Sequence, residues 1–153
     1  MSADAGLFGG LAADAYCTND LAFGLSHRRW ADRTVHKLKM PGGEGRPCEL
    51  GVERTRIEAG DELDALVTAW LQREARTKRG HEVVRRTERE IAGRRGIDVA
   101  ARWRAEPGMV YVREAHVLTA ELWLAFMVSG WWEDAGVCDG HIERVIATLQ
   151  LHG

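Results

Sequence analysis

Glu114 and His116 are the residues of this chain whose types and spacing best suit acid–base chemistry. They lie two positions apart in a segment that alternates like a β-strand, so both side chains should point to one face of a sheet. A carboxylate beside an imidazole can transfer protons or bind a metal ion. The sequence identifies no third group for such a site, and a polar rim of the sheet is the simpler interpretation of the pair.

Two other segments contain reactive or metal-binding residue types. Asp139-Gly-His141-Ile-Glu143 combines carboxylates with an imidazole, but its spacing suits a strand, whereas the surrounding pattern predicts the beginning of a helix. We therefore expect these side chains to cap that helix and to be solvated. Ser26-His27 lacks the Gly-x-Ser-x-Gly turn of serine hydrolases, and Cys48 lies in a Pro/Gly-rich turn, so nucleophilic catalysis has no support.

The segment 73–95 is strongly basic, with nine Lys and Arg residues against four Glu residues. The Glu residues interleave with the basic ones, and no aromatic stacking platform accompanies them. We interpret the segment as a solvent-exposed strand face, with binding of nucleic acid or of an acidic partner as the alternative. The formal charge of the whole chain is only −2, which gives no general reason to bind nucleic acid.

Length and composition indicate one folded domain, because the chain has 153 residues, 45% of them hydrophobic and 29% charged. Its three cysteines, at positions 17, 48 and 138, are too widely spaced for a disulfide framework or a Cys-x-x-Cys metal site, so we expect free thiols. Residues 1–15 contain no Lys or Arg, and no run approaches the ~20 apolar residues of a membrane span. We expect a cytoplasmic protein with a flexible arm over residues 1–15 and a single domain over residues 16–153.

The expected elements follow from apolar periodicity and turn residues. One amphipathic helix is predicted between Asp61, as its N-cap, and Gly80, which closes it; its apolar stripe is Leu63, Leu66, Val67, Trp70 and Leu71. Strands are expected over 21–25, 30–40, 50–57, 81–91, 97–104, 110–118 and 122–128, with a turn at 93–96 and a last helix from about 140. Short turns between consecutive strands predict an α+β fold with an antiparallel sheet flanked by helices.

The segment 122–128 does not alternate as a half-exposed strand should, because it is apolar at every position. Both of its faces are therefore expected to be covered. One cover is the helix layer, and the other is either the second helix, a partner subunit or a ligand. The adjacent Trp131-Trp132 pair cannot point inward twice on a strand, so one of these two rings is expected at the surface.

The order and spacing of several motifs resemble those of the DcrB-like (DUF1795) family. These motifs are Trp30-x-Asp32-x-Thr34-Val35, a strand ending near Arg54, the helix through Trp70, the glycine hairpin at 93–96, Trp103, Arg113-Glu114 and the apolar strand 122–128. The resemblance extends from about Tyr16 to Leu151 and implies the Mog1/PsbP-like α+β sandwich.

Members of this family without a signal peptide include the Eag-type adaptors of type VI secretion. The resemblance implies a non-catalytic, homodimeric, cytoplasmic chaperone that needs no cofactor or metal, binds no nucleic acid and does not insert stably into membranes. Its partners are the hydrophobic N-terminal helices of a PAAR or Rhs effector, held in an apolar groove. A protein-binding or structural module of the same fold in another pathway is the alternative, and an enzyme that uses Glu114 and His116 is a third hypothesis.

The resemblance also implies which residues form the groove. They are Val35, Lys37, Trp70, Val112, Glu114, Trp123, Ala125 and Met127. Trp70 and Glu114 stand where the adaptors have glutamines, and Lys37 stands where they have an apolar residue. We expect Lys37 and Glu114 to pair across the groove floor, which would make this groove more polar.

Overall fold

The computed structural model of the chain describes residues 15–17, 22–24, 35–40 and 42–151. These residues divide into two units, one that contains β1 (Ala15–Cys17) and β2 (Ala22–Gly24) and one that contains the described residues from Val35 onward. In the first unit the two short strands pair antiparallel, with Tyr16 opposite Phe23. The predicted N-terminal arm, residues 1–15, lies almost entirely outside the described residues, as do the Trp30 motif and Ser26-His27.

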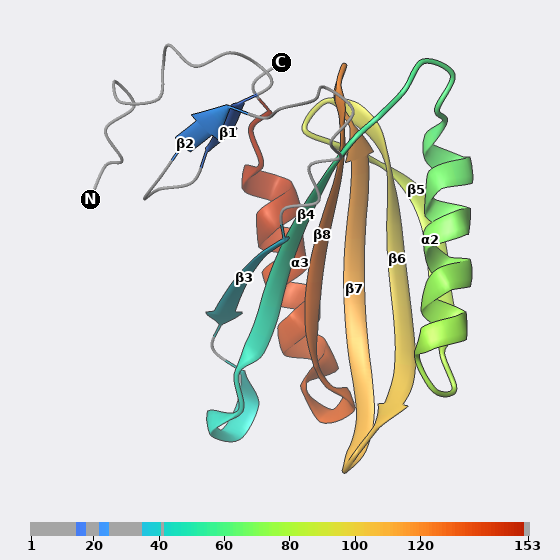
Figure 1. Cartoon of the computed structure of the whole chain (residues 1–153). Coiled ribbons are helices and arrows are strands. Elements are labelled where there is room, and N and C mark those ends of the chain that lie inside the picture. The colour runs from blue at the N-terminus through green and yellow to red at the C-terminus, as the bar shows by residue number, and fades with distance from the viewer. Residues whose placement is uncertain (1–14, 18–21, 25–34, 41, 152–153) are drawn as a thin grey trace. The chain divides into compact units, whose positions relative to one another are not determined.

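The second unit is built on a six-stranded sheet in which every neighbouring pair is antiparallel (Figure 1). The strand order is β3-β4-β8-β7-β6-β5. The strands are β3 (Val35–Met40), β4 (Cys48–Arg56), β5 (Glu82–Ile91), β6 (Arg94–Ala105), β7 (Gly108–Leu118) and β8 (Leu122–Trp131). Two α-helices, α2 (Leu63–Thr77) and α3 (Ala135–Thr148), and two short 3₁₀ turns, η1 (Gly43–Gly45) and η2 (Trp132–Asp134), complete the unit. The predicted α+β class and antiparallel sheet are confirmed.

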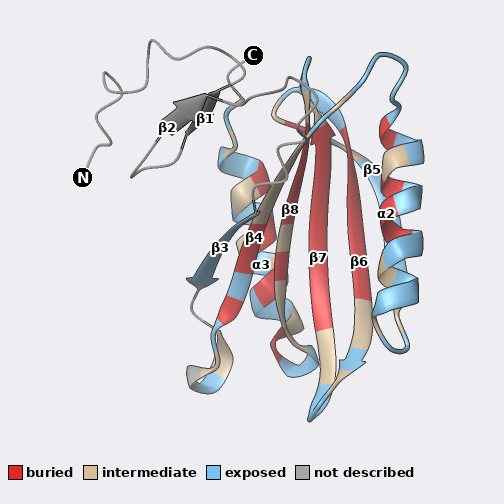
Figure 2. Cartoon of the chain, in the orientation of Figure 1, coloured by how far each residue is buried: buried red, intermediate tan, exposed pale blue. Residues whose placement is uncertain are grey.

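The two helices lie on opposite faces of the sheet, and each has its own apolar cluster. We name the faces after their helices. On the α3 face, Cys138, Ile142 and Ile146 of α3 pack against sheet residues such as Phe126 and Val128. On the α2 face, Val67, Trp70 and Leu71 of α2 pack against Val99, Val112 and Trp123. Burial is deepest in the middle strands β6, β7 and β8 (Figure 2).

Strand β8 is covered on both faces, as its sequence predicts. Phe126 and Val128 lie in the α3 cluster, and Trp123 lies in the α2 cluster. Of the covers that the sequence leaves open, the second helix of the same chain is the one that covers Trp123.

Helix α2 begins at Leu63, two residues after the predicted N-cap. Asp61 instead accepts a hydrogen bond from the backbone N–H of Glu58, 2.8 Å away, and so stabilises the turn before the helix. The predicted apolar stripe is confirmed, because four of its five residues are buried. Gly80 has a φ of +63°, the left-handed conformation expected after a helix end.

Two predicted boundaries are wrong. The hairpin turn before β6 is formed by Ala92 and Gly93, both with positive φ, so the strand resumes at Arg94 instead of 97. Helix α3 begins at Ala135 instead of about 140. The prediction missed its first turns because Gly136 and Gly140 lower the helix propensity there.

Trp132 is 40% exposed, as expected for one of the two adjacent tryptophans. Its ring contacts Tyr111 edge-on, and the guanidinium of Arg102 lies over it. In the described part of the chain, no helix combines the length and the apolar character needed to cross a bilayer.

Candidate functional site

Strand register brings the predicted groove residues to one face of the sheet. One row across the strands runs from Lys37 through Gly51 and Met127 to Glu114. The next row pairs Val35 with Glu53, Glu53 with Ala125, and Ala125 with His116. Val112 and Trp123 face the same way, because they lie two and four positions from Glu114 and Met127 on β7 and β8. This is the α2 face, and Trp70 reaches it from α2.

The predicted set is divided by burial. Val112, Glu114, Trp123, Ala125 and Trp70 are all less than 9% exposed. Lys37, at the outer edge on β3, has a side chain that is 68% exposed. Met127, between these two groups, is half-buried against the α2 cluster. Val112, Glu114 and Trp123 therefore pack against the chain's own helix, and only the outer residues face away from it.

Trp70, Glu114, His116 and Trp123 form a buried polar chain beneath α2. Trp70 donates its indole N–H to Glu114 Oε1 (3.2 Å), and His116 Nε2 lies 3.0 Å from Glu114 Oε2. Trp123 donates its indole N–H to His116 Nδ1 (3.2 Å). Because an indole nitrogen can only donate, Nδ1 carries no proton, so His116 is the neutral tautomer that donates from Nε2. Both carboxylate oxygens of Glu114 thus receive a hydrogen bond.

The interpretation of Glu114 and His116 as a polar rim is wrong. The two side chains are 2% and 0% exposed and lie in the middle of β7. The partners that the sequence did not identify are two indoles, which donate hydrogen bonds and bind no metal. The geometry therefore leaves neither side chain an open position toward a substrate or an ion. Sequence reasoning placed the pair on one face, but Trp70 is 44 positions away from Glu114 and gave no local signal.

The expected Lys37–Glu114 pair is also wrong. Lys37 forms its ion pair with Glu49 across β3 and β4, at 3.3 Å. Strands β4 and β8 lie between Lys37 and Glu114 in the sheet. Lys37, which is exposed, is thus paired with a carboxylate, and Glu114, which is buried, accepts hydrogen bonds from uncharged donors.

We call the outer part of the α2 face the open face. It consists of Lys37 of β3, Glu53 and Thr55 of β4, and Met127 and Ser129 of β8, which are exposed or half-buried, whereas Gly51 and Ala125 between them are buried. Of the two helices that the structure describes, α2 packs on β6 and β7, and α3 lies behind the sheet, so neither covers β3 and β4 on this side (Figure 1). Gly51 permits close contact with its neighbour here, because a Cβ at this position would lie 3.3 Å from the Met127 methyl group.

The other face holds an ionic cluster that sequence reasoning missed. Arg113, with a side chain only 3% exposed, donates to Asp98 at 2.6–3.1 Å, to Asp139 at 2.9 Å and to Glu143 at 3.2 Å. Burial would lower the pKa of Arg113, but the hydrogen bonds to these carboxylates raise it above its ordinary value. Burial also raises the pKa of Tyr111 to about 12, aided by its 2.7 Å hydrogen bond to Asp139.

The expectation that Asp139 and Glu143 cap the helix is wrong, although their side chains are 42% and 48% exposed, as the expected solvation requires. Both lie inside α3, and both accept hydrogen bonds from Arg113. Hydrogen bonds from Arg89 lower the pKa of Glu143 below its ordinary value. No group of three or more His, Cys, Asp or Glu residues in the described ranges is arranged to hold a metal ion.

The basic segment 73–95 is exposed, as predicted, and its strand β5 forms one edge of the sheet. Several of its arginines are paired within the chain. Arg86 donates to Thr68 and to the carbonyl of Asp64, and Arg95 bridges Asp64 and Glu88. Arg86 and Arg95 therefore tie α2 to the neighbouring strands.

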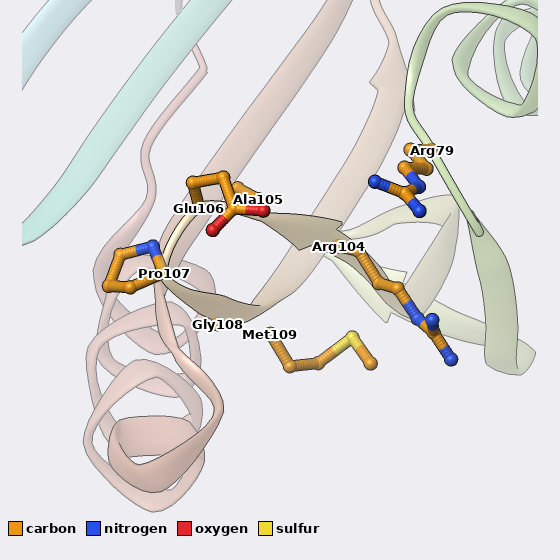
Figure 3. A pocket seen from close by; sticks show the side chains of 7 residues that line it. All are labelled: Arg79, Arg104, Ala105, Glu106, Pro107, Gly108 and Met109. Atoms are coloured by element: carbon orange, nitrogen blue, oxygen red, sulfur yellow. The ribbon is translucent and has the colours of Figure 1, made fainter.

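A cavity of about 560 Å³ lies where the end of α2 meets the β6–β7 hairpin (Figure 3). It is lined by Arg79, Arg104, Ala105, Glu106, Pro107, Gly108 and Met109. None of the predicted groove residues lines it. The candidate site thus remains the face that carries the predicted residues, not this cavity.

Comparison with known proteins identifies the fold and the family. Protein PA94 of Pseudomonas aeruginosa, a protein of unknown function, has a similar structure, with a TM-score of 0.74 at 14% identity over 91% of this chain and 96% of that chain. LpqN of Mycobacterium tuberculosis, which is involved in cell envelope biogenesis, has a TM-score of 0.60 at 6% identity over 76% of this chain and 71% of that chain. No curated protein matches the sequence. The model of the DcrB family matches residues 23–148, so the chain belongs to the DcrB family.

Proposed function

We propose that this member of the DcrB family is a non-catalytic, dimeric chaperone that holds an apolar N-terminal helix of a type VI secretion effector on the open face. The observation that carries the proposal is the asymmetry of the α2 face. Its inner half is packed beneath α2, whereas its outer half carries exposed and half-buried residues that neither described helix covers on β3 and β4.

The chemistry of the open face suits an apolar helix with a polar flank. Gly51 and Ala125 are buried, so a bound helix would contact the half-buried side chains beside them, such as Met127 and Ser129. Met127 is half-buried, and its flexible thioether adapts to partners of different shape. The Lys37–Glu49 pair at the rim is exposed and can face the polar side of a bound helix.

A naked hydrophobic helix in water exposes apolar area at a cost of ~25 cal/mol per Å². A cytoplasmic partner that covers this area before export would lower the cost and prevent aggregation. The buried position of Glu114 and His116 supports a binding role over a catalytic one, because a substrate cannot reach side chains that are 2% and 0% exposed.

Co-expression tests the proposal. The chain is co-expressed with the apolar N-terminal segment of an effector encoded beside it, and the complex is isolated on a tag carried by the effector segment. We expect the unaltered chain to co-purify, Met127→Glu to lose binding at least tenfold, and the matched control Thr87→Glu on exposed β5 to retain it. Circular dichroism and melting establish that both variants are folded.

Two outcomes would contradict the proposal. One is the absence of any complex together with a monomeric chain by light scattering. The other is equal binding by Met127→Glu and Thr87→Glu, which would move the interface away from the open face.

A protein-binding module in another pathway is the second candidate, because LpqN, which shares the fold, is involved in cell envelope biogenesis. If the open face serves such a pathway, the unaltered chain would not bind the effector segment, and Met127→Glu would abolish capture of an envelope protein. The two candidates therefore differ in the partner that this one variant loses.

A further inference from the structure

Cys48 and Cys138 bring two thiols into contact in the core of the α3 face. Their Sγ atoms are 3.5 Å apart, although the residues are 90 positions apart in the chain. The side chains are 1% and 0% exposed. The proposed function does not use them, since they lie on the opposite face of the sheet from the partner site. We propose that this pair is an oxidation site that forms an intramolecular disulfide between β4 and α3.

Gly130 of β8 provides the space that the two sulfurs occupy. A Cβ at this position would lie 2.9 Å from the Cys138 sulfur and 3.2 Å from the Cys48 sulfur, both closer than ordinary contacts. A disulfide bond is about 2.05 Å long, so the sulfurs must approach each other by about 1.5 Å. With no side chain on Gly130, the space around the pair does not oppose this movement.

An ion pair holds the two segments that carry the thiols. Arg46, two residues before Cys48, donates from Nε and Nη2 to the carboxylate of Asp134, both at 3.1 Å. Asp134 lies four residues before Cys138 at the start of α3. Because this contact is bidentate, it fixes the orientation of the two segments as well as their distance. The thiols are thus aligned before any oxidant arrives.

Burial of the two thiols determines how fast they are oxidised and which oxidants can reach them. It raises the pKa of the Cys138 thiol to about 12, aided by contact with Cys48, so this thiol is protonated at neutral pH. Since the thiolate is the nucleophile, oxidation is slow and requires a small oxidant such as hydrogen peroxide. In a reducing cytosol the pair remains a dithiol, and it becomes a disulfide only on exposure to peroxide.

The reaction balances in two steps. One sulfur attacks a peroxide oxygen, the O–O bond breaks, and water leaves, so that this cysteine becomes a sulfenic acid. The second sulfur then attacks the sulfenic sulfur, the S–S bond forms, the S–O bond breaks, and a second water leaves. Overall, two thiols lose two protons and two electrons, and one peroxide is reduced to two waters.

The test uses the full chain with Cys17→Ser, so that the proposed pair holds the only thiols of the chain. The folded protein is treated with hydrogen peroxide, and its intact mass, peptide map and melting temperature are measured. We expect the loss of two hydrogen atoms, a Cys48–Cys138 cross-linked peptide, and a melting temperature raised by several degrees that returns after dithiothreitol. Cys17→Ser/Cys48→Ala and Cys17→Ser/Cys138→Ala serve as controls, and neither should form a link or gain stability.

Three results would overturn the proposal. The first is that the thiols remain reduced in the folded protein. The second is that each thiol is oxidised to a sulfinic acid without a link, and the third is that the link forms only when the protein is unfolded in urea. These readouts are independent of effector binding, so failure of the disulfide and failure of the proposed function are distinguishable.

Discussion

The indole of Trp70 donates a 3.2 Å hydrogen bond to the buried carboxylate of Glu114, which joins the middle of α2 to the middle of β7. This bond makes α2 more than an apolar cover. Glu114 remains buried at 2% exposure because Trp70 and His116 supply one donor to each of its oxygens. The attachment of α2 and the burial of this carboxylate therefore depend on each other.

Trp70→Phe should destabilise the protein by about 1–3 kcal/mol, because it keeps an aromatic ring but leaves Glu114 with one fewer donor. The free energy of unfolding in urea measures the loss. Trp132→Phe is the matched control on a 40% exposed ring, and it should change stability by less than about 0.5 kcal/mol. Equal effects of the two changes would show that the indole N–H of Trp70 is not part of a buried hydrogen bond.

His116 should be the neutral tautomer with its proton on Nε2 at pH 7, because Trp123 donates to Nδ1. Long-range ¹H–¹⁵N correlation spectra of the imidazole measure the tautomer directly. In Trp123→Phe the donor to Nδ1 is absent, and the Nδ1 shift should change while the Glu114 contact at Nε2 persists. A proton on Nδ1 in the unaltered protein would contradict the proposed direction of both hydrogen bonds.

Arg113→Met should cost about 3–5 kcal/mol of stability, because it leaves the buried carboxylate of Asp98 without its main partner. Arg94→Met, at an exposed arginine of the neighbouring strand, is the control and should have little effect. The double variant Arg113→Met/Asp98→Leu should recover part of the loss, since no buried charge remains. No recovery would indicate that packing, and not an unpaired charge, accounts for the loss.

Stability should depend on pH through Glu143, whose pKa is lowered chiefly by its hydrogen bonds from Arg89. Because folding favours the charged carboxylate, its contribution is present above the unfolded pKa of about 4.3 and is lost as the pH falls through the lower, folded pKa.

Glu143→Gln should therefore destabilise the protein at pH 7 and make little difference once the pH is below the lowered, folded pKa, where the native carboxyl is protonated as well. Urea unfolding at several pH values measures the difference between the two proteins. Glu90→Gln, on the exposed edge strand, is the matched control, and it should change stability at pH 7 less than Glu143→Gln does. A Glu143→Gln effect that is constant with pH would rule out this ion pair as its source.

The sequence predicted those parts of the fold that depend on neighbouring residues. Strand alternation, the stripe from Leu63 to Leu71 and the glycines at turns are local patterns, and they led to the antiparallel sheet and α2. The start of α3 was missed, because two glycines interrupt its periodicity while tertiary packing of Cys138, Ile142 and Ile146 stabilises it.

The candidate site was predictable only in part. That Glu114 and His116 share a face followed from their spacing. That they are buried depends on Trp70, which lies in another element and which no local pattern connects to them. The Arg113 cluster was missed for the same reason, because its carboxylates come from β6 and α3 and become partners only in three dimensions.

The central sheet separates two apolar clusters that share no buried residue in the described chain, one under each helix. When a side chain under α2 changes in size, the residues under α3 cannot repack to compensate, because the hydrogen-bonded sheet lies between the two clusters. Packing on the side that carries the open face can accordingly change while the α3 cluster keeps its own arrangement.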